Sequence, residues 1–288
     1  MKTKEAMAEV SSDGVEKRVE RRNRIPIEWE TIELSAAKNL ILIAGLIAGL
    51  LFLCAPAHAQ EPPAPRFKAV AFDYFVIFDA NSVTPEVEQA FQGKGTEFTK
   101  IWRSKQFEYC YLRTITGRET DFFKVTEDAL VYTAEAMKLE LTPETRKRLL
   151  DAYLTLKPWP DAAGALHKLK AAGVRIITIA NFSGKMLRAN ADGVGMTGLF
   201  DELVSTEANG TYKPDPRAYE LGMEKLKLKK EDILFAAFGG WDAYGAKSFG
   251  YTTYWVNRFN LPAEELGIGV DRTSNNLDGL LDFVLGHH

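Results

Sequence analysis

Four short apolar runs recur after residue 66, and stretches with helical periodicity lie between them. The apolar runs span residues 67–72, 174–180, 232–237 and 252–256, and the helical stretches span residues 162–172, 216–226 and 243–249. Runs that are nearly continuous in apolar residues are typical of strands in a parallel sheet that is covered on both faces. Strands that alternate with helices therefore predict an α/β fold with a Rossmann-like, doubly wound parallel sheet.

A long segment between the first two apolar runs has a different pattern. Residues 82–158 show amphipathic helical spacing and no strand-like alternation. Within this segment, Thr142 and Pro143 predict the start of a helix, as an N-cap residue followed by a first-turn proline. We therefore expect a core domain made of residues 67–81 and 159–288, with a helical cap inserted at residues 82–158.

Residues 1–59 form an N-terminal extension with one apolar segment, residues 40–53. This segment is short for a membrane span and suits the core of a signal peptide, and the Ala-His-Ala motif that ends at Ala59 has the form of a cleavage site. We expect export to the periplasm with cleavage near Ala59, followed by a proline-rich linker at residues 60–66. An uncleaved N-terminal anchor and a twin-arginine signal are the alternatives.

The composition favours a globular protein that acts on a small molecule. The 288 residues are 46% hydrophobic and 26% charged, and the net charge is −3. With no dense block of Lys and Arg in the second half, nothing supports a nucleic-acid partner. The only cysteines are Cys54 and Cys110, which excludes a disulfide framework and a Cys-based metal site. Cys110 is expected to be a small buried apolar group.

Polar residues follow the predicted strands, where open α/β sheets bind their ligands. Asp73, Asn181 and Asp242 follow the first three strands, and Lys213 lies in the loop at residues 211–215. A carboxylate becomes a good nucleophile only beside a cation and in a partly dry pocket. Lys213 would supply the cation for Asp73. The aromatic side chains that would exclude water are Phe107, Phe122 and Trp241.

Four stretches of sequence resemble one known family. They are residues 102–109 (WRSKQFEY), 126–130 (TEDAL), 212–215 (YKPD) with Tyr219, and 241–246 (WDAYGA). Over residues 67–285 the chain is similar to the type II (S)-2-haloacid dehalogenases of the haloacid dehalogenase superfamily. The first two stretches lie in the predicted cap, which differs among branches of the superfamily, and they make the resemblance specific.

This resemblance implies a two-step hydrolysis that uses no metal ion or cofactor. The Asp73 carboxylate would displace halide from C2 of a small 2-haloacid, and water would then attack the carbonyl of the aspartyl ester. The product would be a 2-hydroxy acid of inverted configuration. Lys213 would keep Asp73 ionised, and Asp242 would orient or activate the water.

The other site residues take their expected roles from the same resemblance. Arg103 would receive the departing halide together with Asn181 and Phe122. Tyr219 would form a hydrogen bond near Lys213, and Trp241 and Phe107 would wall the pocket. The expected partners are the haloacid and water, with a homodimer, or the membrane for an uncleaved leader, as further alternatives.

Two phenylalanines argue against phosphoryl transfer. The magnesium-dependent phosphatases of the superfamily have a second Asp two residues after the nucleophile and an acidic metal ligand four residues before the Asp242 position. Phe75 and Phe238 occupy these positions here. A phenylalanine neither donates a proton nor binds a hard cation, so a phosphatase activity is not expected.

The chain also departs from the dehalogenase pattern. Residues 73–79 are one residue shorter than the family's segment and lack its Thr, and Ala180, Ala237 and Gly239 replace a Ser, a Ser and an Asn. In the family these side chains hold the substrate carboxylate or position water. A divergent hydrolase acting on another small acid is therefore one alternative, and a non-catalytic periplasmic binding protein with this fold is another.

Each charged position also has a simple structural explanation. Asp73 and Asp242 could cap the helices that follow them, because Asp is a favoured N-cap residue. Lys213 could be an exposed loop lysine beside Pro214, and Arg103 could be a solvated charge on a helix. The position of each side chain in the fold distinguishes these explanations from the catalytic ones.

Overall fold

The computed structural model describes residues 64–286. The predicted leader, its cleavage site and the first part of the linker lie outside the described residues. Within residues 64–286, no helix is both long and apolar enough to cross a membrane.

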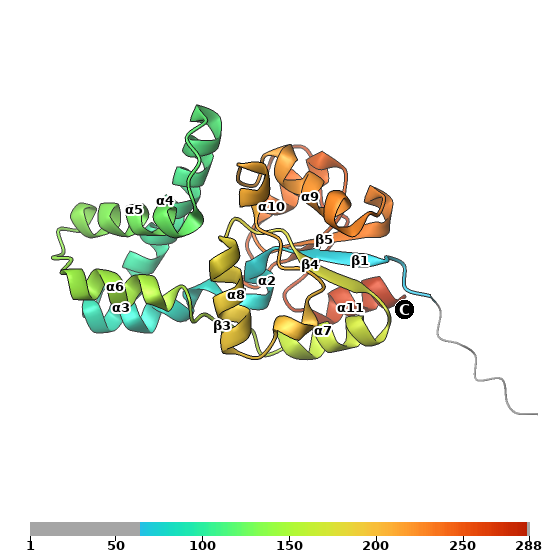
Figure 1. Ribbon diagram of the computed structural model, residues 1–288, viewed down its shortest axis with the longest axis horizontal. Helices are drawn as coiled ribbons and strands as arrows, with labels where there is room; N and C mark the ends of the chain where they lie inside the picture. Colours follow the sequence, from blue (N-terminus) through green and yellow to red (C-terminus); the bar gives the residue numbers. More distant parts are fainter. Residues whose placement is uncertain (1–63, 287–288) are drawn as a thin grey trace, which may run out of the picture. The chain divides into compact units, whose positions relative to one another are not determined.

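A five-stranded parallel sheet with the order β4-β1-β5-β6-β7 forms the centre of the core (Figure 1). Its strands are β1 (Ala69–Phe72), β4 (Arg175–Thr178), β5 (Ile233–Ala237), β6 (Thr252–Val256) and β7 (Arg272–Ser274). The four predicted strands are confirmed, and β7 is an additional edge strand too short and too polar to show as an apolar run. Because β1 lies between β4 and β5, Asp73, the residue after β1, lies at the central part of the sheet edge.

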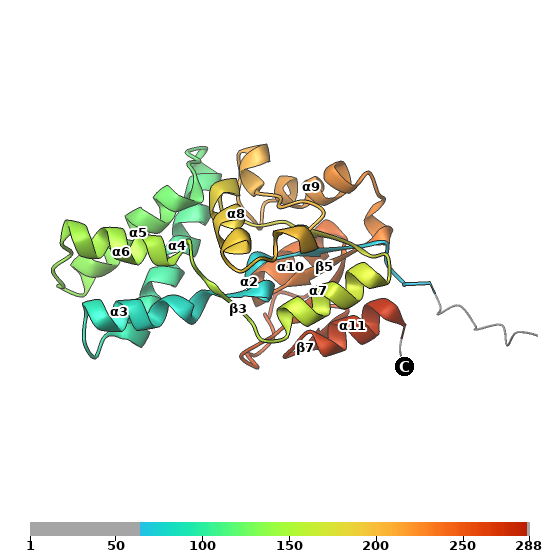
Figure 2. The ribbon, with the colours of Figure 1, turned by 60° about the horizontal axis from the view of Figure 1, so that its bottom comes forward.

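Helices cover both faces of this sheet, which confirms the doubly wound fold. The helices are α7 (Ala162–Ala171) and α11 (Asp278–Leu285) on one face, and α9 (Pro216–Leu226) and α10 (Gly240–Phe249) on the other (Figures 1 and 2). Val70 and Phe72 pack toward the first pair of helices, whereas Ala69 and Ala71 pack toward the second. Burial of both faces explains why β1 is apolar throughout.

The segment predicted as the cap holds four helices. They are α3 (Thr84–Ala90), α4 (Gly95–Thr116), α5 (Phe122–Ala136) and α6 (Pro143–Ala152). The predicted start of α6 is confirmed, because the Thr142 hydroxyl accepts a hydrogen bond from the backbone N–H of Thr145 at 3.2 Å. A short antiparallel pair, β2 (Phe78–Asp79) and β3 (Lys157–Pro158), joins the two crossings between cap and core. Two-residue strands carry no alternating pattern, and this pair was not expected.

The segment after Asp73 forms a single helical turn, α2 (Tyr74–Ile77). Three of its carbonyl groups accept hydrogen bonds from residues elsewhere in the chain. Trp159 Nε1 donates to the Phe75 carbonyl at 3.0 Å, and the Trp159 backbone N–H donates to the Ile77 carbonyl at 2.9 Å. Arg258 Nη2 donates to the Val76 carbonyl at 3.0 Å. The shortened segment thus has a defined backbone path.

Asp161 completes this support. It accepts hydrogen bonds from Arg258 at 2.6 and 2.9 Å and from the backbone N–H of Leu277 at 2.9 Å. Burial alone would raise the pKa of Asp161, but the bonds from Arg258 and Leu277 hold this pKa below its ordinary value. The ion pair therefore stabilises the fold when Asp161 is ionised.

We expect Asp161→Asn to lower the free energy of unfolding at pH 7 by about 2 kcal/mol. Breaking a fully buried pair costs about 3–5 kcal/mol, and a quarter of the Asp161 side chain is exposed to water. Because the folded-state pKa is lowered, the difference from wild type should persist above the unfolded pKa and disappear as the pH falls through the folded value. Urea unfolding from pH 3 to pH 8 measures it.

The matched control is Asp151→Asn, which breaks the exposed ion pair between Lys147 and Asp151. Surface pairs contribute little, so this variant should unfold like wild type. A difference between Asp161→Asn and wild type that stays constant down to pH 3 would contradict the assignment to the charge on Asp161.

Candidate active site

Lys213 and two carboxylates form a buried ionic cluster beside the end of β1. Lys213 Nζ donates to Asp73 Oδ1 at 2.8 Å and to Asp242 Oδ2 at 2.7 Å. The side chains of Lys213, Asp73 and Asp242 are 1%, 11% and 0% exposed. Lys213 is therefore not an exposed loop lysine. One ammonium between two carboxylates leaves the cluster with an excess of negative charge when both are ionised.

The helix-capping explanations do not account for the two carboxylates. Asp73 stands at the N-cap position of α2, but its side chain makes no capping hydrogen bond. Asp242 lies inside the first turn of α10, whose N-cap residue is Gly239. The Lys213 backbone N–H donates to Asn181 Oδ1 at 2.8 Å, so Asn181 fixes the loop that carries the lysine.

Tyr219 supports the cluster from α9. Its hydroxyl donates to Asp242 Oδ1 at 2.7 Å, so both oxygens of Asp242 accept a hydrogen bond. A Cβ atom at Gly245 would collide with this hydroxyl, and a glycine here therefore allows α9 and α10 to approach closely. The predicted hydrogen bond of Tyr219 near Lys213 thus reaches the lysine through Asp242.

Burial and charge shift the titration of the cluster in opposite directions. Burial, with the nearby charge of Asp73, raises the pKa of Asp242 to about 6 although Lys213 and Tyr219 favour its ionised form. Burial disfavours the charge on Lys213, but the attraction of Asp242 and Asp73 outweighs it and raises the pKa of Lys213. Lys213 is therefore a cation in the resting site, whereas Asp242 titrates close to neutral pH.

Asp73 opens into a cavity of about 90 Å³. The predicted residues that line it are Asp73, Arg103, Phe107, Phe122, Asn181, Lys213 and Trp241, and the lining residues that were not predicted are Tyr74, Phe75, Gln106, Cys110, Ala180, Phe182, Phe238 and Gly239. Asp242 and Tyr219 do not line the cavity, since they lie behind Lys213. Gln106 stands almost one helical turn after Arg103, and this spacing could have identified it.

Arg103 projects from the cap helix α4 onto core residues. Its guanidinium carbon lies 4.8 Å from the ring centre of Phe75 and 5.7 Å from that of Phe238. Nη1 donates to Asn81 Oδ1 at 3.3 Å. Burial lowers the pKa of Arg103, although an arginine remains charged in proteins. The guanidinium of Arg103 is therefore a cation held in place at the cavity. It is not a solvent-exposed charge on the surface of α4.

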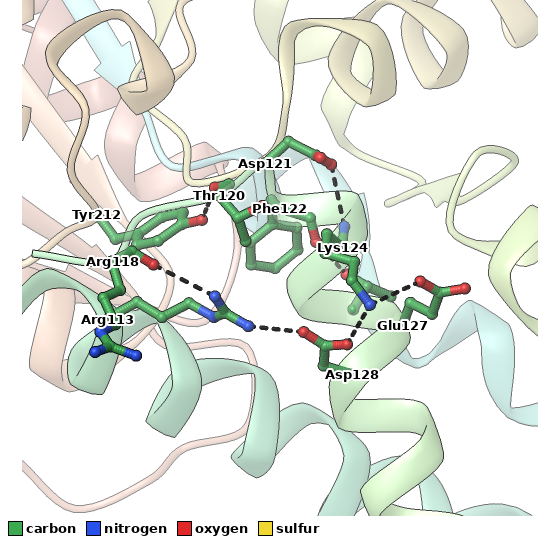
Figure 3. Close-up of polar contacts among 10 residues, drawn as sticks. Arg113, Arg118, Thr120, Asp121, Phe122, Lys124, Glu127, Asp128 and Tyr212 are labelled. Carbon is green, nitrogen blue, oxygen red and sulfur yellow. Dashed lines mark hydrogen bonds and ion pairs between the residues drawn. The ribbon is translucent and has the colours of Figure 1, made fainter. Parts of the chain in front are cut away.

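Phe122 is positioned by the loop that precedes α5 (Figure 3). The hydroxyl of Tyr212, the residue before Lys213, donates to the Thr120 carbonyl. At the other side of the loop, Arg113 forms an ion pair with Asp128 at 2.7 Å. The cap loop is thus attached directly to the core loop that carries the lysine, a contact that no sequence motif indicated.

Cys110 lines the cavity but is 1% exposed. Burial raises the pKa of its thiol far above the ordinary value, as expected for an unreactive buried cysteine. In the part of the chain that the structure describes, His, Cys, Asp and Glu side chains form no group of three or more that could hold a metal ion.

Comparison with known proteins identifies the class to which this fold and site belong. The family model "haloacid dehalogenase-like hydrolase" matches residues 67–250. A solved structure of L-2-haloacid dehalogenase from Xanthobacter autotrophicus, with chloropropionic acid covalently bound, superposes with a TM-score of 0.72 at 32% identity. The superposition covers 77% of this chain and 100% of that one.

Curated relatives narrow the class. The (S)-2-haloacid dehalogenase of Pseudomonas sp. (strain YL) is 40% identical over 69% of this chain and 87% of its own length. Haloacetate dehalogenase H-2 of Moraxella sp. (strain B) is 37% identical over 76% of this chain and 98% of its own length. The chain belongs to the (S)-2-haloacid dehalogenase family of haloacid dehalogenase-like hydrolases.

The bond between Tyr219 and Asp242 yields a prediction about stability. Tyr219→Phe removes a donor to a buried carboxylate, and hydrogen bonds to charged groups contribute about 1.5–3 kcal/mol. We expect the free energy of unfolding at pH 7.5, where Asp242 is ionised, to fall by about 2 kcal/mol. Urea unfolding measures the change. The control Tyr111→Phe alters a residue that is 51% exposed, and a loss of the same size there would contradict the assignment.

Proposed function

We propose that this protein hydrolyses small (S)-2-haloalkanoic acids to 2-hydroxy acids with inversion, through an aspartyl ester on Asp73. The observation that carries the proposal is the Asp73 carboxylate, paired with Lys213 at 2.8 Å and facing a cavity that seven aromatic residues help to line. Relatives at 35–40% identity are named (S)-2-haloacid dehalogenases, and the related Xanthobacter enzyme has been captured with chloropropionic acid covalently bound.

In the first step an Asp73 oxygen attacks C2 of the substrate from the side opposite the halogen. A carbon–oxygen bond forms, the carbon–halogen bond breaks, and the halide leaves with the bonding electrons, which inverts C2. The aromatic walls strengthen the reaction by excluding water from the carboxylate. Arg103 is the cation that receives the halide, with Asn181 and Phe122 beside it in the same cavity.

In the second step water attacks the carbonyl carbon of the ester on Asp73. The bond from this carbon to the substrate-bearing oxygen breaks, so the product hydroxyl carries an oxygen of Asp73 and the water oxygen remains on the enzyme. Asp242 has the pKa of an effective base near neutral pH. Since Asp242 contacts the cavity through Lys213, we assign the lysine as the relay. Lys213 passes a proton to Asp242, takes the water proton in its place, and returns a proton to the product oxygen when the ester bond breaks.

The positive charge in this scheme comes from Lys213 and Arg103, and no cofactor takes part. The substitutions Ala180, Ala237 and Gly239 leave fewer side-chain donors for the substrate carboxylate than the family pattern has. A divergent hydrolase of another small acid, or a binding protein without turnover, remains the alternative if no halide is released.

The test is halide release from (S)-2-chloropropionate. We expect chloride and (R)-lactate in equal amounts, with a rate unaffected by EDTA, because Lys213 and Arg103 supply the charge. Asp73→Asn should lower the rate at least about 1,000-fold by removing the nucleophile. Ion chromatography and chiral analysis of lactate measure the products. Loss of activity in EDTA that magnesium restores would reject the mechanism.

A second measurement on the same reaction tests the covalent step. After multiple turnovers in heavy-oxygen water, mass spectrometry of the peptide that contains Asp73 should find the label in that residue. An active enzyme with unlabelled Asp73 would exclude the aspartyl ester.

The raised pKa of Asp242 predicts the pH dependence of kcat. Below about pH 6 Asp242 becomes protonated and no longer accepts the proton, so kcat should fall about tenfold per pH unit. Tyr219→Phe removes a donor that stabilises the ionised form, and this variant should move the fall to higher pH. Steady-state kinetics from pH 4.5 to pH 8.5 measures both profiles. A wild-type kcat that is constant down to pH 4.5 would contradict the role of Asp242.

A further inference from the structure

The cavity at Asp73 adjoins a second, larger hollow. This outer cleft has a volume of about 680 Å³ and is lined by Asn81, Thr84, Thr96, Thr99, Lys100, Arg103, Ser104, Phe107, Trp241 and Phe259. Arg103, Phe107 and Trp241 line both hollows. The ring centres of Phe107 and Trp241 are 4.3 Å apart. These two rings and the guanidinium thus form the partition between the inner cavity and the outer cleft.

Gly239 allows Trp241 to occupy its place in this partition. A Cβ atom at Gly239 would lie 2.6 Å from Trp241 Nε1 and 3.0 Å from Cδ1. The backbone of Gly239 has φ −88° and ψ 143°, which any residue adopts without strain. The requirement for glycine is therefore steric, and any side chain at position 239 forces the indole of Trp241 to move.

The charge of the outer cleft suits an anionic substrate. Lys100 and Arg103 line it together with Thr96, Thr99 and Ser104, and no Asp or Glu is among its lining residues. A cleft lined by one sign of charge raises the local concentration of a ligand of the opposite sign. A small carboxylate is thereby attracted to the outer side of the partition.

We propose that the outer cleft is the access route of the substrate, and that Phe107 and Trp241 form a gate that selects acids by chain length. Gly239 is then a specificity-determining residue, because it permits the closed position of Trp241. This inference rests on the proposed function. One relative of this chain is named for haloacetate and others are named for (S)-2-haloacids.

The test compares long with short substrates. For wild type, Trp241→Ala, Phe107→Ala and Gly239→Ala, kcat/KM is measured with (S)-2-chloropropionate and (S)-2-chlorohexanoate. We expect the ratio of long to short substrate to rise at least tenfold in each variant, because each removes or displaces one half of the gate. Ile115→Ala, an exposed position on the same helix as Phe107, is the matched control and should keep the wild-type ratio.

A double variant shows whether Gly239 acts through Trp241. In the Trp241→Ala background, adding Gly239→Ala should change the ratio less than twofold, because no indole remains to be displaced. An additional tenfold change there would overturn the assignment of Gly239. Unchanged ratios in the three single variants would overturn the gate itself.

The access route has its own measurement. Lys100→Gln should raise KM for (S)-2-chloropropionate about threefold at low salt with kcat unchanged, and added salt should remove the difference. A KM equal to wild type at low salt would overturn the route.

Binding separates failure of the gate from failure of the proposed function. Calorimetric dissociation constants of propionate and hexanoate give the same length ratio without turnover. A wild type that releases no halide while its variants change this ratio would reject only the proposed function. An active wild type whose variants keep the ratio would reject only the gate.

Discussion

The site depends on one buried ammonium group held between two carboxylates. Lys213 contacts Asp73 and Asp242 at 2.8 and 2.7 Å, and removing the lysine would leave two uncompensated carboxylates inside the protein. The parallel sheet makes the arrangement feasible, since β1 and β5 are neighbours and end at the same edge. Tyr219 and Asn181 then fix the positions of Asp242 and of the lysine backbone.

Aromatic rings provide the environment in which this charge cluster can react. The rings of Phe75 and Phe238 stand where related phosphatases have acidic residues. Phe75 and Phe238 therefore lack the carboxylates that would bind a metal cation. Their rings instead pack against the guanidinium of Arg103, which is a cation fixed to the protein. Arg103 comes from the cap and its partners come from the core, so the cavity exists only when both are in contact.

The sequence predicted the parts of this arrangement that leave local signals. Continuous apolar runs identified four strands, and Thr142 with Pro143 marked the start of α6. The position of Asp242 behind Lys213 and the steric relation between Gly239 and Trp241 left no such signal. Both features depend on the direction in which the chain runs from the end of β5 into α10. The strand β7 and the pair of β2 with β3 are too short for periodicity to show.

The contacts of α2 fix the backbone next to the nucleophile. Trp159, at the return of the chain from the cap, donates two hydrogen bonds to carbonyl groups within four residues of Asp73. Trp159 and α2 both belong to the core, so these bonds fix the backbone that aims the nucleophile without any contribution from the cap. The cap instead supplies Arg103 to the cavity. The attacking carboxylate and the cation opposite it are therefore held by two separate parts of the fold, which can vary independently in sequence.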